Sequence, residues 1–332
     1  MSREHGGVPG RVQTKRATTS RFCAVVGVAL VSALAAPAEA VEGGVGRPIS
    51  GATIVPYAGI VPPESMSVLS VGEIYYDGSI GGSRTVPIGQ NLALGVDMQV
   101  AFLPFTLAHI WHTDTKRWNF ASALSIPMAW VQAEATVTLG PLTGRRKEDE
   151  FGMFDIAVVP IQASYHFSQT AHMALNLTVW APTGKYDPND LANLSNNNWS
   201  FMPGLAFTKI NPKSNLEFSG VWTLEFDTEN PATDYQNGIL SDLEFLAVKR
   251  FKKGAGIGLV GSWIDQLTDD DGDLADLLNG FSGHAVGLGP IFTYSMKVGD
   301  HHVDMHGRWI HEFDAENRPE GDVIMFTVGS AL

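Results

Sequence analysis

The chain has 332 residues, of which 44% are hydrophobic and only 17% charged, and its net charge is −13. Few charges together with 35 glycines argue against a disordered chain and are typical of a protein with many strands and turns. The acidic balance excludes a general nucleic-acid-binding protein, because contact with phosphates needs a basic face.

Residues 1–40 have the three parts of a secretory signal peptide. A basic segment ends at Arg21, an apolar run covers 22–36, and Ala38-Glu39-Ala40 supplies small residues for cleavage before Val41. The run is too short for a transmembrane anchor. The only cysteine lies inside it, so we expect no disulfide in the mature chain. Cleavage would leave 17 basic and 33 acidic residues, a net charge of −16.

Residues 41–65 are rich in glycine and proline and show no strand pattern. Two interpretations stay open for this segment. It is either a periplasmic linker or a partial plug that enters the lumen of the domain that follows.

Residues 66–332 read as apolar, alternating segments whose connections are long and short in turn. An outer-membrane barrel has this rhythm, because short turns face the periplasm and long loops face outward. We therefore predict an all-β fold, an antiparallel up-and-down transmembrane β-barrel of about 12 strands, with 14 possible. The predicted strands are 66–77, 92–112, 117–137, 152–167, 171–181, 198–209, 215–226, 240–251, 254–265, 284–296, 301–313 and 321–332.

Two of these segments are long for a single crossing. Pro104 interrupts 92–112 and Pro127 interrupts 117–137, and proline removes a ladder hydrogen bond. Either both strands project beyond the membrane or one of them hides a further hairpin.

The alternation predicts which face meets lipid. Strand 215–226 carries apolar residues such as Phe218 and Trp222 on one side and Glu217 and Glu225 on the other. Charges of both signs could not share a dry core. We expect the apolar faces to point outward and all eight tryptophans to lie in aromatic girdles.

Ionisable residues on the polar faces are the candidate pore-lining groups. Two histidines and an aspartate on one strand could share a metal ion, whereas a hydrated lumen wall or a substrate contact are the alternatives. We predict that the lumen is lined by His302, Asp304, His306, Arg308, Glu312, Glu217, Glu225, Asp242 and Glu244.

An acidic stretch in the loop 266–283 resembles a calcium-binding loop. Asp269, Asp271 and Asp273 lack the full spacing and the late glutamate of an EF-hand, so a solvated acidic loop is the simpler interpretation. Acidic outer loops could also share divalent cations with lipopolysaccharide.

An enzyme is a weaker alternative. His311 lies on an apolar face and Ser295 on the preceding strand, an arrangement that a barrel lipid hydrolase would need. No serine motif accompanies them, and we expect neither catalysis nor a cofactor.

Several short motifs contain the residues Asp155, Pro182, Thr183, Gly184, Tyr186, Asn198, Trp199, Pro203, Gly289 and Pro290. In combination these motifs resemble the outer-membrane family named for the meta-pathway of phenol degradation, which includes sphingosine-induced outer-membrane proteins. The resemblance implies a Gram-negative outer-membrane barrel that takes up hydrophobic or aromatic compounds. It also implies insertion by the barrel-assembly machinery, although Leu332 stands where such barrels usually end in an aromatic residue.

Together these patterns predict an outer-membrane channel for passive uptake of small hydrophobic or aromatic molecules, with specificity set by the lumen. The alternatives are a structural or surface barrel without a transport role and a secreted soluble β-protein.

Overall fold

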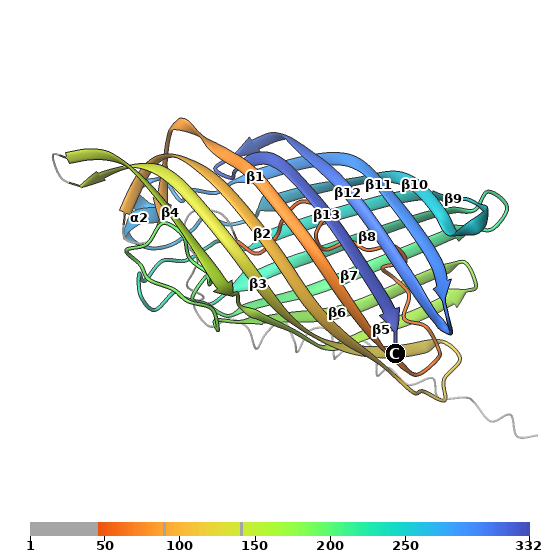
Figure 1. The fold of residues 1–332 in the computed structure, drawn as a ribbon. Coiled ribbons are helices and arrows are strands. Elements are labelled where there is room, and N and C mark those ends of the chain that lie inside the picture. Colours follow the sequence, from red (N-terminus) through yellow and green to blue (C-terminus); the bar gives the residue numbers. More distant parts are fainter. Residues whose placement is uncertain (1–45, 89–90, 140–141) are drawn as a thin grey trace, which may run out of the picture. The chain divides into compact units, whose positions relative to one another are not determined.

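The computed structural model describes residues 46–88, 91–139 and 142–332, so the predicted signal peptide lies outside the described residues. Thirteen strands, a short helix α2 (Asp273–Leu277) and a 3-10 turn η2 (Lys252–Gly254) make up the fold (Figure 1). The strands are β1 (Met66–Ile88), β2 (Asn91–Trp111), β3 (Trp118–Leu139), β4 (Leu142–Met153), β5 (Ile156–Ser168), β6 (Ala171–Ala181), β7 (Ser200–Asn211), β8 (Leu216–Asp227), β9 (Leu240–Arg250), β10 (Ala255–Gln266), β11 (His284–Val298), β12 (His301–Glu316) and β13 (Glu320–Ala331).

Twelve of the strands close into an antiparallel barrel, which confirms the predicted fold class. Each pairs with its neighbours in sequence, and β13 closes the ring by pairing with β1. The exception is β4, which pairs only with residues 128–139 of β3, whereas residues 118–125 of β3 pair with β5. Closure leaves no open edge in the ring, as a wall facing lipid requires. No helix in the described part is long and apolar enough to cross a membrane.

The wall has its apolar face outside. In β8, Phe218 is 48% and Trp222 is 45% exposed, whereas Glu217 and Glu225 are each 1% exposed. Burial alternates in the same way along β7 and β9. Because successive strand residues point to opposite faces, the acidic side chains lie in the interior and the aromatic ones meet lipid.

Strand register places the extracellular edge of the membrane. A row of outward side chains across β12, β13, β1, β2 and β3 includes Trp309, Tyr75 and Trp130. Two residues further toward the long loops, the next row of outward side chains is polar. It includes Asp322 on β13, Asp77 on β1 and Gln99 on β2. An aromatic band bounded by a polar row is the girdle expected at a lipid–water interface.

The opposite girdle lies beside the short turns. Trp118 contacts Tyr165 with ring centroids 4.9 Å apart, and Tyr165 contacts Phe167 at the same distance. Trp111 is exposed at the end of β2. One tryptophan departs from the prediction, because Trp180 lines an interior cavity instead of a girdle.

A charge placed on the lipid face should destabilise the barrel according to its depth. Phe245 is 42% exposed on the outer face of β9, between the two girdles. We expect Phe245→Arg to lower the free energy of unfolding in lipid vesicles by about 2–4 kcal/mol, as arginine costs near a bilayer midplane. Phe251→Arg, in the exposed turn after β9, is the matched control and should cost at most about 1 kcal/mol. Equal losses in a guanidinium titration would contradict this placement of the membrane.

Two predicted loops, 78–91 and 138–151, are wrong over the described residues. β1 and β2 pair through Ile88 and Asn91, and β3 and β4 pair up to Leu139 and Leu142. These segments therefore continue the strands beyond the girdle. Their inward apolar residues form a cluster with residues from distant loops, which explains why the ladders persist outside the membrane. The cluster contains Ile80, Val86, Ala93, Val96, Ala133, Ala135, Leu191 and Phe281.

Candidate functional site

Residues 46–65, here called the lumen segment, lie inside the barrel. Ile54 is fully buried and packs in one cluster with inward residues of the wall, including Leu246, Val260 and Ile310. The segment has no strand pattern, so its backbone groups need partners from the wall.

Arg47 fixes the first part of the lumen segment. Its guanidinium forms an ion pair with Asp155 at 2.7 Å, and both side chains are almost fully buried. It also donates hydrogen bonds to Ser200 Oγ at 2.9 Å and to the carbonyl oxygen of Asn198 at 3.2 Å. The backbone N–H of Arg47 donates to the carboxylate of Glu225 at 3.0 Å. Arg47 thus joins the strands β7 and β8, the break between β4 and β5, and the loop before β7.

The rest of the segment is held mainly by inward carboxylates. Arg308 supplies the opposite kind of contact, since its Nη1 donates to the carbonyl oxygens of Gly51 and Ile54, both at 2.6 Å. Buried carboxylates are tolerated where donors satisfy them. The donors are Ser50 Oγ to Glu312 (2.6 Å), Thr53 Oγ1 to Asp242 (2.9 Å), Ile54 N to Glu244 (2.6 Å) and Tyr57 N to Glu217 (2.5 Å).

The predicted pore-lining residues therefore fall into two groups. The six that contact the lumen segment are buried in the interior: Glu217, Glu225, Asp242, Glu244, Arg308 and Glu312. The other three lie nearer the short-turn end of β12: His302 is exposed, Ser295 donates to Asp304, and His306 accepts from Arg308 at 3.1 Å. What the sequence could not show is that a segment of the same chain fills the space between them.

In the acidic loop after β10, the buried side chain is that of Asp270, which was not among the three candidate aspartates. Asp270 is 5% exposed and accepts hydrogen bonds from Tyr235 Oη, Gly238 N and Gln266 Nε2, all within 2.7 Å. Asp271 bonds through its backbone to Gln236. Among the described residues, no group of three or more metal-ligating side chains is placed to hold an ion.

The hydrogen bonds that Asp270 accepts, and with them the closure of this loop, should depend on pH. Burial raises the pKa of Asp270 to about 7 from a usual 3.8. Below pH 4 the group is protonated in both the closed and the opened loop. Between pH 4 and 7 only the opened loop releases its proton, so closure weakens as pH rises. We expect the hydrogen-exchange protection factors of Gly238 and Ile239 to fall by about tenfold or more from pH 5 to pH 8. Asp270→Asn should remove this dependence, and a pH-independent wild type would contradict the assignment.

Ser295 and His311 do not meet. Ser295 donates to Asp304, an interior-face residue of β12, whereas His311 lies on the lipid face and contacts Asp322 at 3.1 Å. The register places His311 opposite Leu288 rather than Ser295. The Ser–His pair of a lipid hydrolase is therefore not formed by these residues.

Two of the other motif residues, Thr183 and Gly184, contact Asp155. The wall is interrupted here, since β4 ends at Met153 and β5 starts at Ile156. The Asp155 carboxylate accepts hydrogen bonds from the backbone N–H of Thr183 and Gly184 at 2.9 Å and of Asn196 at 3.1 Å, besides its ion pair with Arg47. Gly184 lies so close to the Leu194 carbonyl that a side chain would clash. Asp155 thus joins a loop, the wall and the lumen segment.

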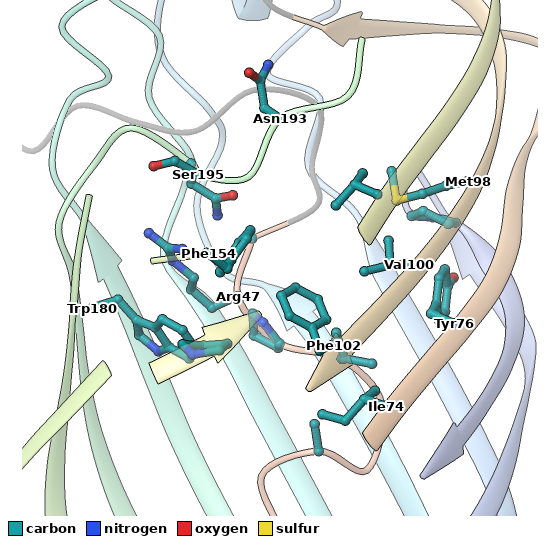
Figure 2. Close-up of a pocket in the computed structure, with 18 of the residues that line it drawn as sticks. Arg47, Ile74, Tyr76, Met98, Val100, Phe102, Phe154, Trp180, Asn193 and Ser195 are labelled. Atoms are coloured by element: carbon teal, nitrogen blue, oxygen red, sulfur yellow. The ribbon is translucent and has the colours of Figure 1, made fainter. Parts of the chain in front are cut away.

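An interior cavity of about 490 Å³ lies between the lumen segment and the strands β1, β2, β3 and β6. Figure 2 shows Ile74, Met98 and Val100 on one side, and Arg47 with Trp180 on the other. Phe154 packs edge-on against Phe102, with ring centroids 4.8 Å apart. The volume and the mainly apolar lining are those of a small-molecule pocket.

The sequence profile of one family, described as "Putative MetA-pathway of phenol degradation", matches residues 79–328. The chain belongs to this family. The resemblance predicted from its motifs is confirmed. No curated protein matches the sequence.

The architecture is shared by a solved structure of an outer-membrane protein. A COG4313 outer membrane channel from Pseudomonas putida F1 superposes with a TM-score of 0.65 at 12% identity, over 84% of this chain and 100% of that chain. A Pseudomonas aeruginosa FadL homologue matches at a TM-score of 0.42 and 8% identity, over 89% and 98%. The beta domain of the Bordetella autotransporter BrkA matches at 0.41 and 12%, over 80% and 98%. The first of these likenesses supports the fold of an outer-membrane barrel, and the bacterial outer membrane is where this family member resides.

Proposed function

We propose that the protein is a channel for passive uptake of small hydrophobic or aromatic molecules across the outer membrane. The observation that carries this proposal is the apolar cavity, which lies inside the wall on the long-loop side of the lumen segment. A cavity of this kind shelters an apolar solute from water, and a lipid-facing wall does not need one. The similar P. putida protein is described as an outer membrane channel.

The polar contacts support a selective rather than an open path. The lumen segment occupies the interior, and its hydrogen bonds to buried carboxylates oppose a water-filled pore. We propose that residues 46–65 act as a plug that a solute must pass. Outer-membrane lipids contact the outer face, and we expect lipopolysaccharide at the extracellular girdle.

Filling the cavity should stop uptake. Ala133 lies on β3, is 2% exposed and lines the cavity. We expect Ala133→Trp to reduce uptake of radiolabelled naphthalene to the level of cells that lack the protein, in cells with an intact lipopolysaccharide leaflet. Ala101 lies on the adjacent strand β2 and faces outward beside Trp130, so Ala101→Trp is the matched control. If wild-type protein does not raise uptake, a structural barrel without a transport role becomes the better interpretation.

A further inference from the structure

The cavity has two chemically different sides. β1, β2 and β3 contribute apolar residues, including Ile74, Val100 and Val131. β6 contributes every second residue, with Asn176 and Thr178 preceding the indole of Trp180. Because alternate strand residues share a face, the carboxamide and the hydroxyl form a short polar stripe opposite an apolar wall.

The Asn176 and Thr178 side chains are unpaired in the part of the chain that the structure describes. Within the described residues, neither Asn176 nor Thr178 makes a side-chain hydrogen bond or an ion pair. Asn193, which also lines the cavity, differs from them, since its Nδ2 donates to the Asp187 carbonyl. Both side chains are half-buried in the cavity, so a ligand that displaces water from them must supply a hydrogen bond of its own.

The strand next to β6 makes room for the carboxamide. Gly204 on β7 is directly opposite Asn176 in the register. A Cβ at residue 204 would clash with Asn176 Oδ1, so glycine is what allows the carboxamide to lie there. Gly204 therefore leaves the space that the Asn176 carboxamide occupies, and a larger residue at this position would displace it.

The charged groups of the cavity are already engaged. Arg47 is paired with Asp155, and the two carboxylate oxygens of Glu312 accept hydrogen bonds from Ser50 Oγ and Tyr76 Oη. A charged ligand would have to break such contacts or lose its hydration without compensation. An uncharged ligand avoids this cost.

We propose that Asn176, supported by Thr178, is the polar anchor of the cavity and that it selects uncharged apolar molecules bearing one hydroxyl group. The hydroxyl hydrogen-bonds with the Asn176 carboxamide, which has both a donor and an acceptor, while the apolar body lies against β1–β3. A hydrocarbon of the same shape leaves the carboxamide unpaired, and a site built to hydrogen-bond a group discriminates against the analogue that lacks it. This assignment rests on the proposed function.

Binding of three probes with one ring skeleton tests the anchor. Titration calorimetry with the protein in lipid nanodiscs, corrected with empty nanodiscs, compares 2-naphthol, naphthalene and 2-naphthoate. We expect the wild type to bind 2-naphthol most tightly. Asn176→Leu should weaken 2-naphthol binding by roughly tenfold and leave naphthalene binding unchanged or tighter. Gln99→Leu, the same kind of change on the outer face of β2, is the control.

Gly204→Ala provides a second variant in case Asn176→Leu fails to fold. It keeps the asparagine but displaces its carboxamide, and it should reduce the preference for 2-naphthol in the same direction. Equal wild-type binding of 2-naphthol and naphthalene, abolished by Ala133→Trp, would overturn the anchor but keep the proposed function. A preference that survives both variants would also overturn the anchor. Absence of binding of all three probes would count against the cavity as a binding site and thus against both proposals.

Discussion

Deletion of residues 46–63 is expected to raise the single-channel conductance of the barrel several-fold. The deleted residues fill the interior, and the wall groups that hold them are carboxylates and arginines, which water can solvate once the segment is gone. The strands themselves begin at Met66, so the twelve-stranded ring is left intact. Conductance is measured in planar bilayers, and we expect cation selectivity, because the exposed wall would be mainly acidic.

A single substitution within the lumen segment serves as the control for this deletion. Thr53→Val removes one hydrogen bond to Asp242 and should leave the conductance near the wild-type value. Heat-modifiable migration on gels verifies that both variants are folded. Equal conductance of the deletion variant and the wild type would show that the lumen segment does not obstruct the path.

Arg47→Ala is expected to lower the free energy of unfolding by about 3–5 kcal/mol. The substitution leaves Asp155 as a buried carboxylate without its ionic partner, and it removes the hydrogen bonds to Ser200 and Asn198. It also removes a cation that lies 5.2 Å from the ring centroid of Trp180. Guanidinium titration of the barrel in lipid vesicles measures the loss.

Lys185→Ala is the matched control for the buried pair. Lys185 contacts Glu150 at 2.5 Å, but its side chain is 57% exposed, so the loss should be much smaller than for Arg47→Ala. The double variant Arg47→Ala with Asp155→Asn should recover part of the stability, because no unpaired charge then remains. Equal losses for Arg47→Ala and Lys185→Ala would mean that Asp155 is solvated.

The wall could be predicted closely because its pattern is local. The predicted strand 171–181 coincides with β6, and 301–313 lies within β12. Lipid on one side and a polar interior on the other require alternation at each step of the strand, and alternation is visible without knowledge of any partner. The same argument placed Glu217, Glu244 and Arg308 on inward faces.

The errors occur where the partner is distant in the chain. Residues 78–88 contain Gly81 and Gly82 and few apolar residues, so they resemble a loop. They remain in the ladder because Ile80 and Val86 pack with Leu191 and Phe281. The cavity was missed for a similar reason, since Asn176 belongs to β6 and its apolar counterparts come from three strands earlier in the chain.

The alternating sequence by itself determined that the chain forms a barrel, which faces meet lipid and which charges lie inside, because each of these depends on residues two apart. Only the tertiary structure decided what the charges contact. Glu217, Glu244 and Glu312 bind backbone and side-chain donors of residues 46–65, which lie more than 150 residues away in sequence. A carboxylate beside water and one beside a backbone N–H have the same local pattern, and closure of the ring brings the donor to it.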